Sequence, residues 1–193
     1  MGARFKTEGI TLKKGDLIMA LTSNQHVLDW VKEMEELMTP DKTIWIDGSE
    51  GQLRALREQA FATGELTELN QEELPGCVLH HTAKNDVARV EDRTFICCEK
   101  EEDAGPTNHW VEPKEMYERM YALADGAYKG RTMYIIPYSM SIIGSPFAKY
   151  GFELTDSIYV VLNMHIMTRI GKAVCDALGD DEGFIKGLHC QCN

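Results

Sequence analysis

Two short groups of cysteine and histidine carry side chains that bind zinc in many proteins. They are Cys77-x-x-His80-His81 in the middle of the chain and His189-Cys190-x-Cys192 near residue 193. Thiolate and imidazole are the usual zinc ligands, but structural sites commonly draw them from paired CxxC knuckles, and no such pair occurs here. The first group also lies in an expected strand, where alternation sends neighbouring side chains to opposite faces. The spacing therefore disfavours zinc, and we expect no metal ligands in this chain.

Arginine is the residue type to examine for anion binding in so acidic a chain. Lys and Arg number 20 against 31 Asp and Glu, a formal net charge of −11. Such a surface repels nucleic acid and anionic lipid, so we expect neither as a partner, and a small dianionic ligand would need a local positive site. By residue type alone, Arg89 is more often a solvated surface arginine, here paired with Glu91 or Asp92. Arg131 and Arg169 are expected at a strand start and inside a helix, where orienting roles are common, and we leave them out of the site.

Motifs for nucleotide binding and nucleophilic catalysis are not found in the sequence. It contains no G-x-x-x-x-G-K-[ST] phosphate loop, no G-x-G-x-x-G after a strand, and no defensible Ser-His-Asp or reactive-cysteine pattern. We therefore expect nothing in this chain to bind a nucleotide. No apolar stretch approaches the length of a membrane span, and Met1 to Lys14 lacks the apolar core of a signal peptide, so a soluble, cytoplasmic protein is expected.

The six cysteines favour reduced thiols. They stand at positions 77, 97, 98, 175, 190 and 192, without the spacing of a small secreted disulfide scaffold. For the adjacent pair Cys97 and Cys98 we expect one thiol in the core and one facing outward.

Strand and helix signals alternate along the chain, too irregularly for a purely parallel sheet. Helices are expected at 23–38, from Leu53 to Phe61, from Pro113 to Gly126, and from Met164 to Leu178. Strands are expected at Thr43–Asp47, Cys77–His81, Arg93–Cys98, Arg131–Pro137 and Ile158–Leu162, giving a β-rich middle. Ser49 is expected to cap a helix, and Asp47 to lie in a turn. The sequence thus predicts an α/β fold with a mixed sheet and flanking helices, in one domain over 1–193.

Four segments, taken in order, resemble the GTP-dependent phosphoenolpyruvate carboxykinase family. They are Ile46–Glu50 (IDGSE), Asn85–Phe95 (NDVARVEDRTF), Gly130–Pro137 (GRTMYIIP) and Leu154–Gly171 (LTDSIYVVLNMHIMTRIG). A lone DGS triplet carries no weight, whereas the longer segments at family-like intervals are specific. The resemblance implies the fold of the N-terminal domain of a carboxykinase, which helps to hold the substrate.

The resemblance also implies an activity and a role for one residue. The family interconverts oxaloacetate with phosphoenolpyruvate and carbon dioxide, using GTP or GDP and manganese or magnesium. Arg89 matches the family arginine that grips the substrate carboxylate, and Glu91 resembles a family acid near a closing lid. A guanidinium offers a carboxylate two parallel donors, which suits this role. The expected partners are a small dicarboxylate or enol-phosphate substrate and a C-terminal portion that binds nucleotide and metal.

The sequence departs from the family pattern at three places. Ser141-Ile142-Ile143 stands where Gly-Pro-Leu is usual, and His165 stands where arginine is usual. After Lys186 the Tyr-Gly-Gly and paired-lysine segment, the phosphate loop and the metal-binding residues of the family are missing. We therefore expect the substrate-binding portion of a carboxykinase, inactive in isolation. Two alternatives stay open: a free-standing module that binds small carboxylates without catalysis, and a thiol or zinc protein.

Overall fold

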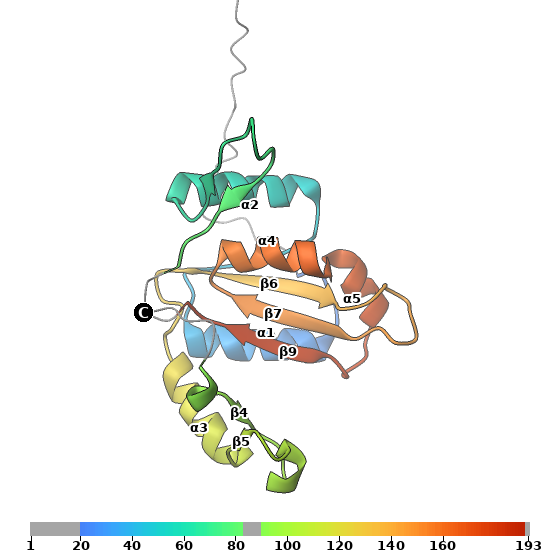
Figure 1. The fold of residues 1–193 in the computed structure, drawn as a ribbon. Helices are drawn as coiled ribbons and strands as arrows, with labels where there is room; N and C mark the ends of the chain where they lie inside the picture. Colours follow the sequence, from blue (N-terminus) through green and yellow to red (C-terminus); the bar gives the residue numbers. More distant parts are fainter. Residues whose placement is uncertain (1–19, 83–89, 192–193) are drawn as a thin grey trace, which may run out of the picture.

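A computed structural model describes residues 20–82 and 90–191 (Figure 1). The α-helices are α1 (Gln25–Met38), α2 (Glu50–Thr63), α3 (Pro113–Ala124), α4 (Ile158–Met167) and α5 (Lys172–Leu178), with 3-10 turns η1 (Glu91–Arg93) and η2 (Glu101–Ala104). The strands are β1 (Lys42–Trp45), β2 (Thr67–Glu68), β3 (Val78–Leu79), β4 (Phe95–Ile96), β5 (His109–Trp110), β6 (Thr132–Ser139), β7 (Tyr150–Thr155), β8 (Arg169–Ile170) and β9 (Ile185–His189).

The main sheet is mixed, as the sequence predicts. Its strand order is β1-β6-β7-β9, and β8 pairs with the end of β6. β1 runs parallel to β6, β7 runs antiparallel to β6, and β9 runs parallel to β7. Because β6 and β7 are antiparallel, the start of β6 lies beside the end of β7, with Tyr134 opposite Thr155.

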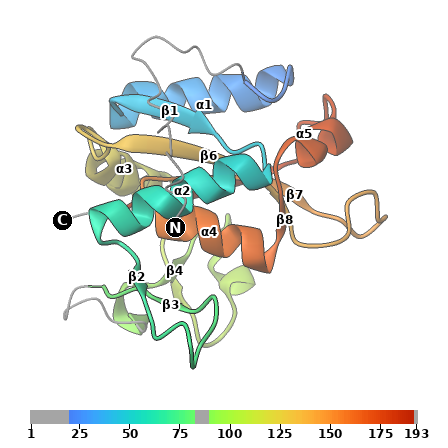
Figure 2. The ribbon, with the colours of Figure 1, turned by 90° about the horizontal axis from the view of Figure 1, so that it is seen from above.

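Helices cover both faces of this sheet, which gives the α/β class (Figure 1). On one face α1 and α5 bury a cluster with the sheet: Val27, Trp30, Val31, Met34, Met38, Trp45, Ala124, Tyr128, Met133, Ile135, Phe152, Leu154, Cys175 and Leu178. On the other face α2 and α4 lie side by side (Figure 2) and bury a second cluster: Ile44, Ile46, Leu53, Leu56, Ala60, Leu66, Tyr134, Ile136, Ile158 and Val161. Burial of this apolar surface is the main stabilising contribution to the fold.

The helix predicted at 23–38 is confirmed as α1. The Asn24 side chain accepts hydrogen bonds from the N–H groups of His26 and Val27, which otherwise have no partner within the helix. Its amide also donates to the carbonyl oxygens of Gly179 and Asp181, at 2.9 and 2.8 Å. This buried asparagine therefore joins the start of α1 to the end of α5.

The predicted strand Ile158–Leu162 is wrong, because these residues form the first part of α4. Ser157 caps the helix by accepting from the Val160 N–H. Ile158 and Val161, three positions apart, face the sheet, while Tyr159 between them is exposed. A short apolar run does not by itself distinguish a strand from a buried helix, and here the preceding cap decides for helix.

The single helix predicted from Met164 to Leu178 is also wrong. The chain leaves α4 at Met167, forms β8, and begins α5 only after Gly171. Gly171 has φ +102°, and a Cβ at this position would lie 2.1 Å from the carbonyl oxygen of Asp47. The segment that follows β1 thus lies so close to residue 171 that only glycine fits there. The positive φ of this glycine interrupts the helical pattern.

The two strands predicted in the middle of the chain are present but much shorter than expected. Within them, only Val78–Leu79 and Phe95–Ile96 form strands, and they pair with β2 and β5 in separate two-stranded sheets. Leu79, Phe95 and Ile96 are exposed, so these runs bury little of the surface that stabilises a larger sheet. The segment from β4 to α3 instead extends away from the main sheet on the side of α1 (Figure 1). The main sheet instead contains β7 and β9, two strands that are not predicted from the sequence.

No helix in the described ranges 20–82 and 90–191 is long and apolar enough to cross a membrane.

Candidate functional site

Arg89, the predicted substrate contact, lies outside the described residues. The chain reaches this region from His80, whose ring stacks on Tyr159 with centroids 3.9 Å apart. His80 Nδ1 also lies 2.7 Å from the carbonyl oxygen of Glu65. Where the described chain resumes at residue 90, the carbonyl oxygen of Val90 accepts from the Arg93 N–H at 2.9 Å, and Glu91 is exposed in η1. The described chain just before residue 83 is therefore held at the first turn of α4.

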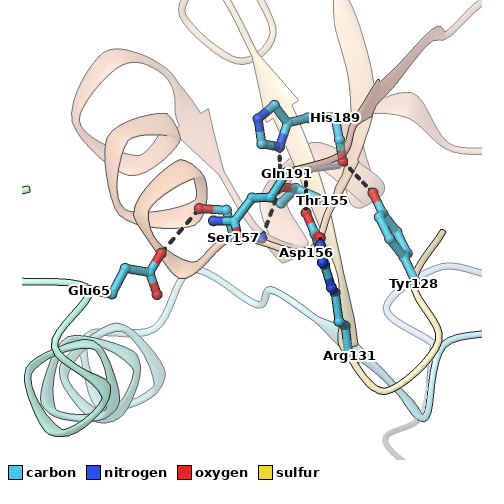
Figure 3. Close-up of polar contacts among 8 residues, drawn as sticks. All are labelled: Glu65, Tyr128, Arg131, Thr155, Asp156, Ser157, His189 and Gln191. Carbon is cyan, nitrogen blue, oxygen red and sulfur yellow. Dashed lines mark hydrogen bonds and ion pairs between the residues drawn. The ribbon is translucent and has the colours of Figure 1, made fainter. Parts of the chain in front are cut away.

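A polar network lies at the end of the main sheet where β6 begins and β7 ends (Figure 3). Its central contact joins the Arg131 guanidinium to a carboxylate oxygen of Asp156. The Asp156 side chain is 0% exposed and that of Arg131 is 28% exposed. A buried carboxylate needs a charged partner, so this pair has a structural role, in line with the orienting role expected for Arg131.

The same network holds the chain that follows β9. The second oxygen of Asp156 accepts from the Gln191 N–H at 3.0 Å. The Tyr128 hydroxyl donates to the carbonyl oxygen of His189 (Figure 3). Asp156 therefore connects the start of β6 with the exit from β9, two places far apart in the sequence.

His189 takes part in this network through its ring. Its Nδ1 lies 2.9 Å from the Thr155 hydroxyl oxygen, which also accepts from the Ser157 N–H at 3.1 Å. The parallel pairing of β7 and β9 sets Thr155 opposite His189. Within residues 20–82 and 90–191 no three His, Cys, Asp or Glu side chains gather as metal ligands.

The N-terminus of α4 is occupied by a carboxylate of the chain itself. Glu65 Oε1 accepts from the Ser157 hydroxyl at 3.1 Å and from the Tyr159 N–H at 2.8 Å. The positive end of the helix dipole favours such a charge. Burial, together with the Glu65 charge, raises the pKa of the nearby Tyr134 phenol to about 12. Because Glu65 already uses these donors, this helix end stabilises the fold rather than offering a site for an external anion.

The remaining predicted residues have modest roles. Arg169 is exposed in β8, opposite Ser139. Ser49 caps α2 by accepting from the Gln52 N–H, and Asp47 accepts from the Ser49 N–H within the turn, as predicted. Of the departures from the family pattern, His165 is exposed in the last turn of α4, and Ser141–Ile143 lies in the loop that projects beyond β6 and β7 (Figure 2).

Sequence analysis missed the connection among Asp156, Thr155 and His189. The signal was present, because Gly130–Pro137 and Leu154–Gly171 were both recognised as specific segments. What it did not reveal is that β6 and β7 are antiparallel neighbours, which brings the beginning of one segment to the beginning of the other.

Comparison with known proteins agrees with this architecture. Residues 29–193 match the family model described as phosphoenolpyruvate carboxykinase N-terminal domain. The chain belongs to this family. Similar members include the GTP-dependent phosphoenolpyruvate carboxykinases of Anaeromyxobacter sp. (strain K), 53% identical over 174 residues, and of Corynebacterium jeikeium (strain K411), 47% identical over 170 residues.

These carboxykinases are much longer than this chain. The matches cover 89% and 88% of the chain but only 29% and 28% of the two relatives. A third relative, the GTP-dependent phosphoenolpyruvate carboxykinase of Corynebacterium glutamicum (strain R), is 45% identical over 88% of the chain and 28% of its own length. The chain therefore spans less than a third of the carboxykinases it matches.

Proposed function

We propose that this chain is the N-terminal, substrate-binding portion of a GTP-dependent phosphoenolpyruvate carboxykinase. That enzyme converts oxaloacetate and GTP into phosphoenolpyruvate, GDP and carbon dioxide, in the cytoplasm and in the direction of gluconeogenesis. The observation that carries the proposal is the family match over residues 29–193, supported by relatives that share about half of their aligned residues with it. Residues 1–193 form one domain in this proposal.

The chemistry divides between two portions of the enzyme. Decarboxylation of oxaloacetate produces an enolate, which then takes the γ-phosphoryl group of GTP. In this proposal GTP and manganese or magnesium bind to a C-terminal portion of the enzyme, and the chain accordingly covers only 29% of the Anaeromyxobacter sp. (strain K) relative. We propose that the present chain contributes Arg89, whose guanidinium holds the substrate carboxylate through two parallel hydrogen bonds.

The edge of the main sheet supports contact with such a second portion. β9 is the terminal strand in the described order, and Ile185 and Leu188 on it are 46% and 42% exposed. Strand edges with exposed apolar side chains are commonly covered in a complete protein. The contacts of Asp156 and Tyr128 fix the chain just beyond this strand. We therefore place the C-terminal portion against β9.

Binding of oxalate, a small dicarboxylate that resembles the enolate, tests the proposed role of Arg89. One charge-assisted pair contributes roughly 1.5–3 kcal/mol, which barely offsets the cost of immobilising a small ligand, so millimolar or weaker binding is expected. NMR titration of the full chain should show shifts that Arg89→Met abolishes and Arg89→Lys weakens. The matched control is Arg93→Met, which removes an exposed guanidinium four residues away and should leave the shifts unchanged.

Two results would count against the proposal. Equal shifts in the parent and in Arg89→Met would remove Arg89 from the site. Micromolar binding of oxalate by the chain alone would favour a free-standing carboxylate-binding module, since a portion of a larger site should bind weakly. The isolated chain should also show no GTP-dependent turnover of oxaloacetate, because phosphoryl transfer requires positioned nucleotide and metal.

A further inference from the structure

Two adjacent thiols lie just beyond strand β4. Cys97 is exposed and Cys98 is half-buried, and both are free thiols. Cys97 is thus the expected outward thiol, whereas the expectation that the other thiol lies in the core is wrong, since Cys98 is only half-buried. The two residues follow Ile96, the last paired residue of β4, and are joined by a single peptide bond.

Two hydrogen bonds hold Cys98 in place. Its carbonyl oxygen accepts from the indole N–H of Trp110 at 2.9 Å, and its Sγ lies 3.2 Å from the carbonyl oxygen of Lys100, to which the thiol donates. The Trp110 backbone in turn pairs with Ile96 across β4 and β5. The dithiol is thus attached to a small ordered unit that contains a tryptophan.

The other described cysteines differ from this pair. Cys175 is buried in the main core, and burial raises the pKa of its thiol to about 12, which suppresses the reactive thiolate. Cys77 is exposed and Cys190 is half-buried, and neither has a cysteine next to it in the sequence. Cys97 and Cys98 are accordingly the described thiols placed to act together on one reagent.

We propose that Cys97 and Cys98 form a two-thiol modification site, which binds trivalent arsenicals through both sulfurs and is oxidised by small disulfides to a vicinal disulfide. With phenylarsine oxide, each sulfur forms one bond to arsenic, and the oxygen on arsenic leaves as water with the two thiol protons. With glutathione disulfide, the Cys97 thiolate attacks one sulfur, forms a mixed disulfide and releases one glutathione thiolate. The Cys98 thiolate then attacks Cys97 Sγ and releases the second glutathione. Each cysteine gives up its proton to a glutathione thiolate, and the two electrons pass from the cysteine pair to glutathione.

The geometry of adjacent residues makes such a disulfide easy to reduce. Consecutive Cα atoms lie about 3.8 Å apart, closer than the roughly 4.4–6.8 Å spacing of ordinary disulfides. Strained and exposed disulfides are the labile ones. Closing the ring also constrains the backbone and side-chain angles of Cys98, whose carbonyl oxygen accepts from the Trp110 indole N–H, so we expect that hydrogen bond to change. Fluorescence of Trp110 should therefore report on the site, while Trp30 and Trp45 stay buried in the main core.

Binding of phenylarsine oxide to the full chain tests the dithiol directly. The parent protein should bind one equivalent and change its tryptophan fluorescence. Cys97→Ser and Cys98→Ser should each bind at least about 100-fold more weakly, because a single thiol lacks the effective concentration of the second. Cys77→Ser, which removes an exposed single thiol, should bind as the parent does. Equal affinity in Cys97→Ser and the parent would overturn the proposal.

Titration with glutathione disulfide tests the redox step separately. Mass spectrometry of the parent should find an intramolecular disulfide within the peptide that contains residues 97 and 98, reversed by dithiothreitol. Cys98→Ser should stop at the mixed disulfide on Cys97, and circular dichroism should show that this variant keeps the parent fold. A stable mixed disulfide in the parent, without ring closure, would contradict the proposal.

Discussion

Replacing Arg131 with methionine should destabilise the chain far more than loss of an exposed arginine would. The replacement keeps an unbranched side chain of similar reach but removes the positive charge that pairs with Asp156, whose side chain is 0% exposed. The Gln191 N–H also donates to that carboxylate. One amide does not compensate for a buried charge.

The structure sets the size of this effect. Removal of one partner from a buried ion pair costs about 3–5 kcal/mol. Because the Arg131 side chain is 28% exposed, water reaches the pair in part, and we expect the lower end, about 3 kcal/mol. Arg119→Met is the matched control, since Arg119 pairs with Glu115 on the surface of α3, with both side chains more than half exposed. It should cost about 0.5 kcal/mol or less.

Urea denaturation at neutral pH measures both free energies of unfolding. The Arg131→Met midpoint should fall strongly at an unchanged m-value, and the Arg119→Met midpoint should stay near that of the parent. In a double-mutant cycle, Arg131→Met and Asp156→Asn should couple by more than 1 kcal/mol. Equal, small losses for Arg131→Met and Arg119→Met would refute the structural role assigned to the buried pair.

Three further predictions concern the fold. Asn24→Ala should cost about 2 kcal/mol or more in urea denaturation, against about 1 kcal/mol for the exposed cap variant Ser49→Ala, because Asn24 also donates to two carbonyl oxygens across the core. The Tyr134 phenol has a pKa of about 12 in the folded chain, against about 10 in the unfolded chain. The stability that the protonated phenol contributes is therefore intact below pH 10 and is lost as the pH rises to 12. The free energy of unfolding should therefore fall by about 2 kcal/mol less over this range in Tyr134→Phe than in the parent; identical pH profiles would contradict this. Gly171→Ala should prevent normal folding, judged by circular dichroism and proteolysis, whereas Gly51→Ala, with open space around the added carbon, should be neutral or stabilising.

The parts of the fold that sequence predicted well are those fixed by local chemistry. Helix α1 follows from its cap, Asn24, and an apolar stripe, and α3 begins at Pro113 as expected. Strand β6 follows from its run of apolar residues with high strand propensity. Each of these signals lies within the element itself.

The errors arise where distant contacts decide the structure. β7 has a glycine, Gly151, in its interior, which weakens the strand signal, and the Tyr138 ring on β6 occupies the space that a side chain there would fill. The carbonyl oxygen of Asp47 explains why Gly171 ends a helical pattern, and it comes from a segment more than a hundred residues earlier. Neither contact can be read from a local window of sequence.

The candidate site divides in the same way. Arg89 followed from a specific segment, and its contact with substrate stays a prediction. The network around Asp156 was missed because pairing of β6 with β7, and of β7 with β9, brings Arg131, Thr155 and His189 together. Charge and spacing in the sequence give no indication of that pairing.

A chimeric enzyme tests the central claim most directly. Residues 29–193 of this chain would replace the aligned segment of the Anaeromyxobacter sp. (strain K) carboxykinase, with Arg89 intact or changed to methionine and with Arg93→Met as the control. The account predicts GTP-dependent conversion of oxaloacetate to phosphoenolpyruvate by the intact chimera and by Arg93→Met, and a large loss of kcat/KM in Arg89→Met with GTP binding retained. A folded chimera that binds GTP and is equally active with Met at position 89 would contradict it.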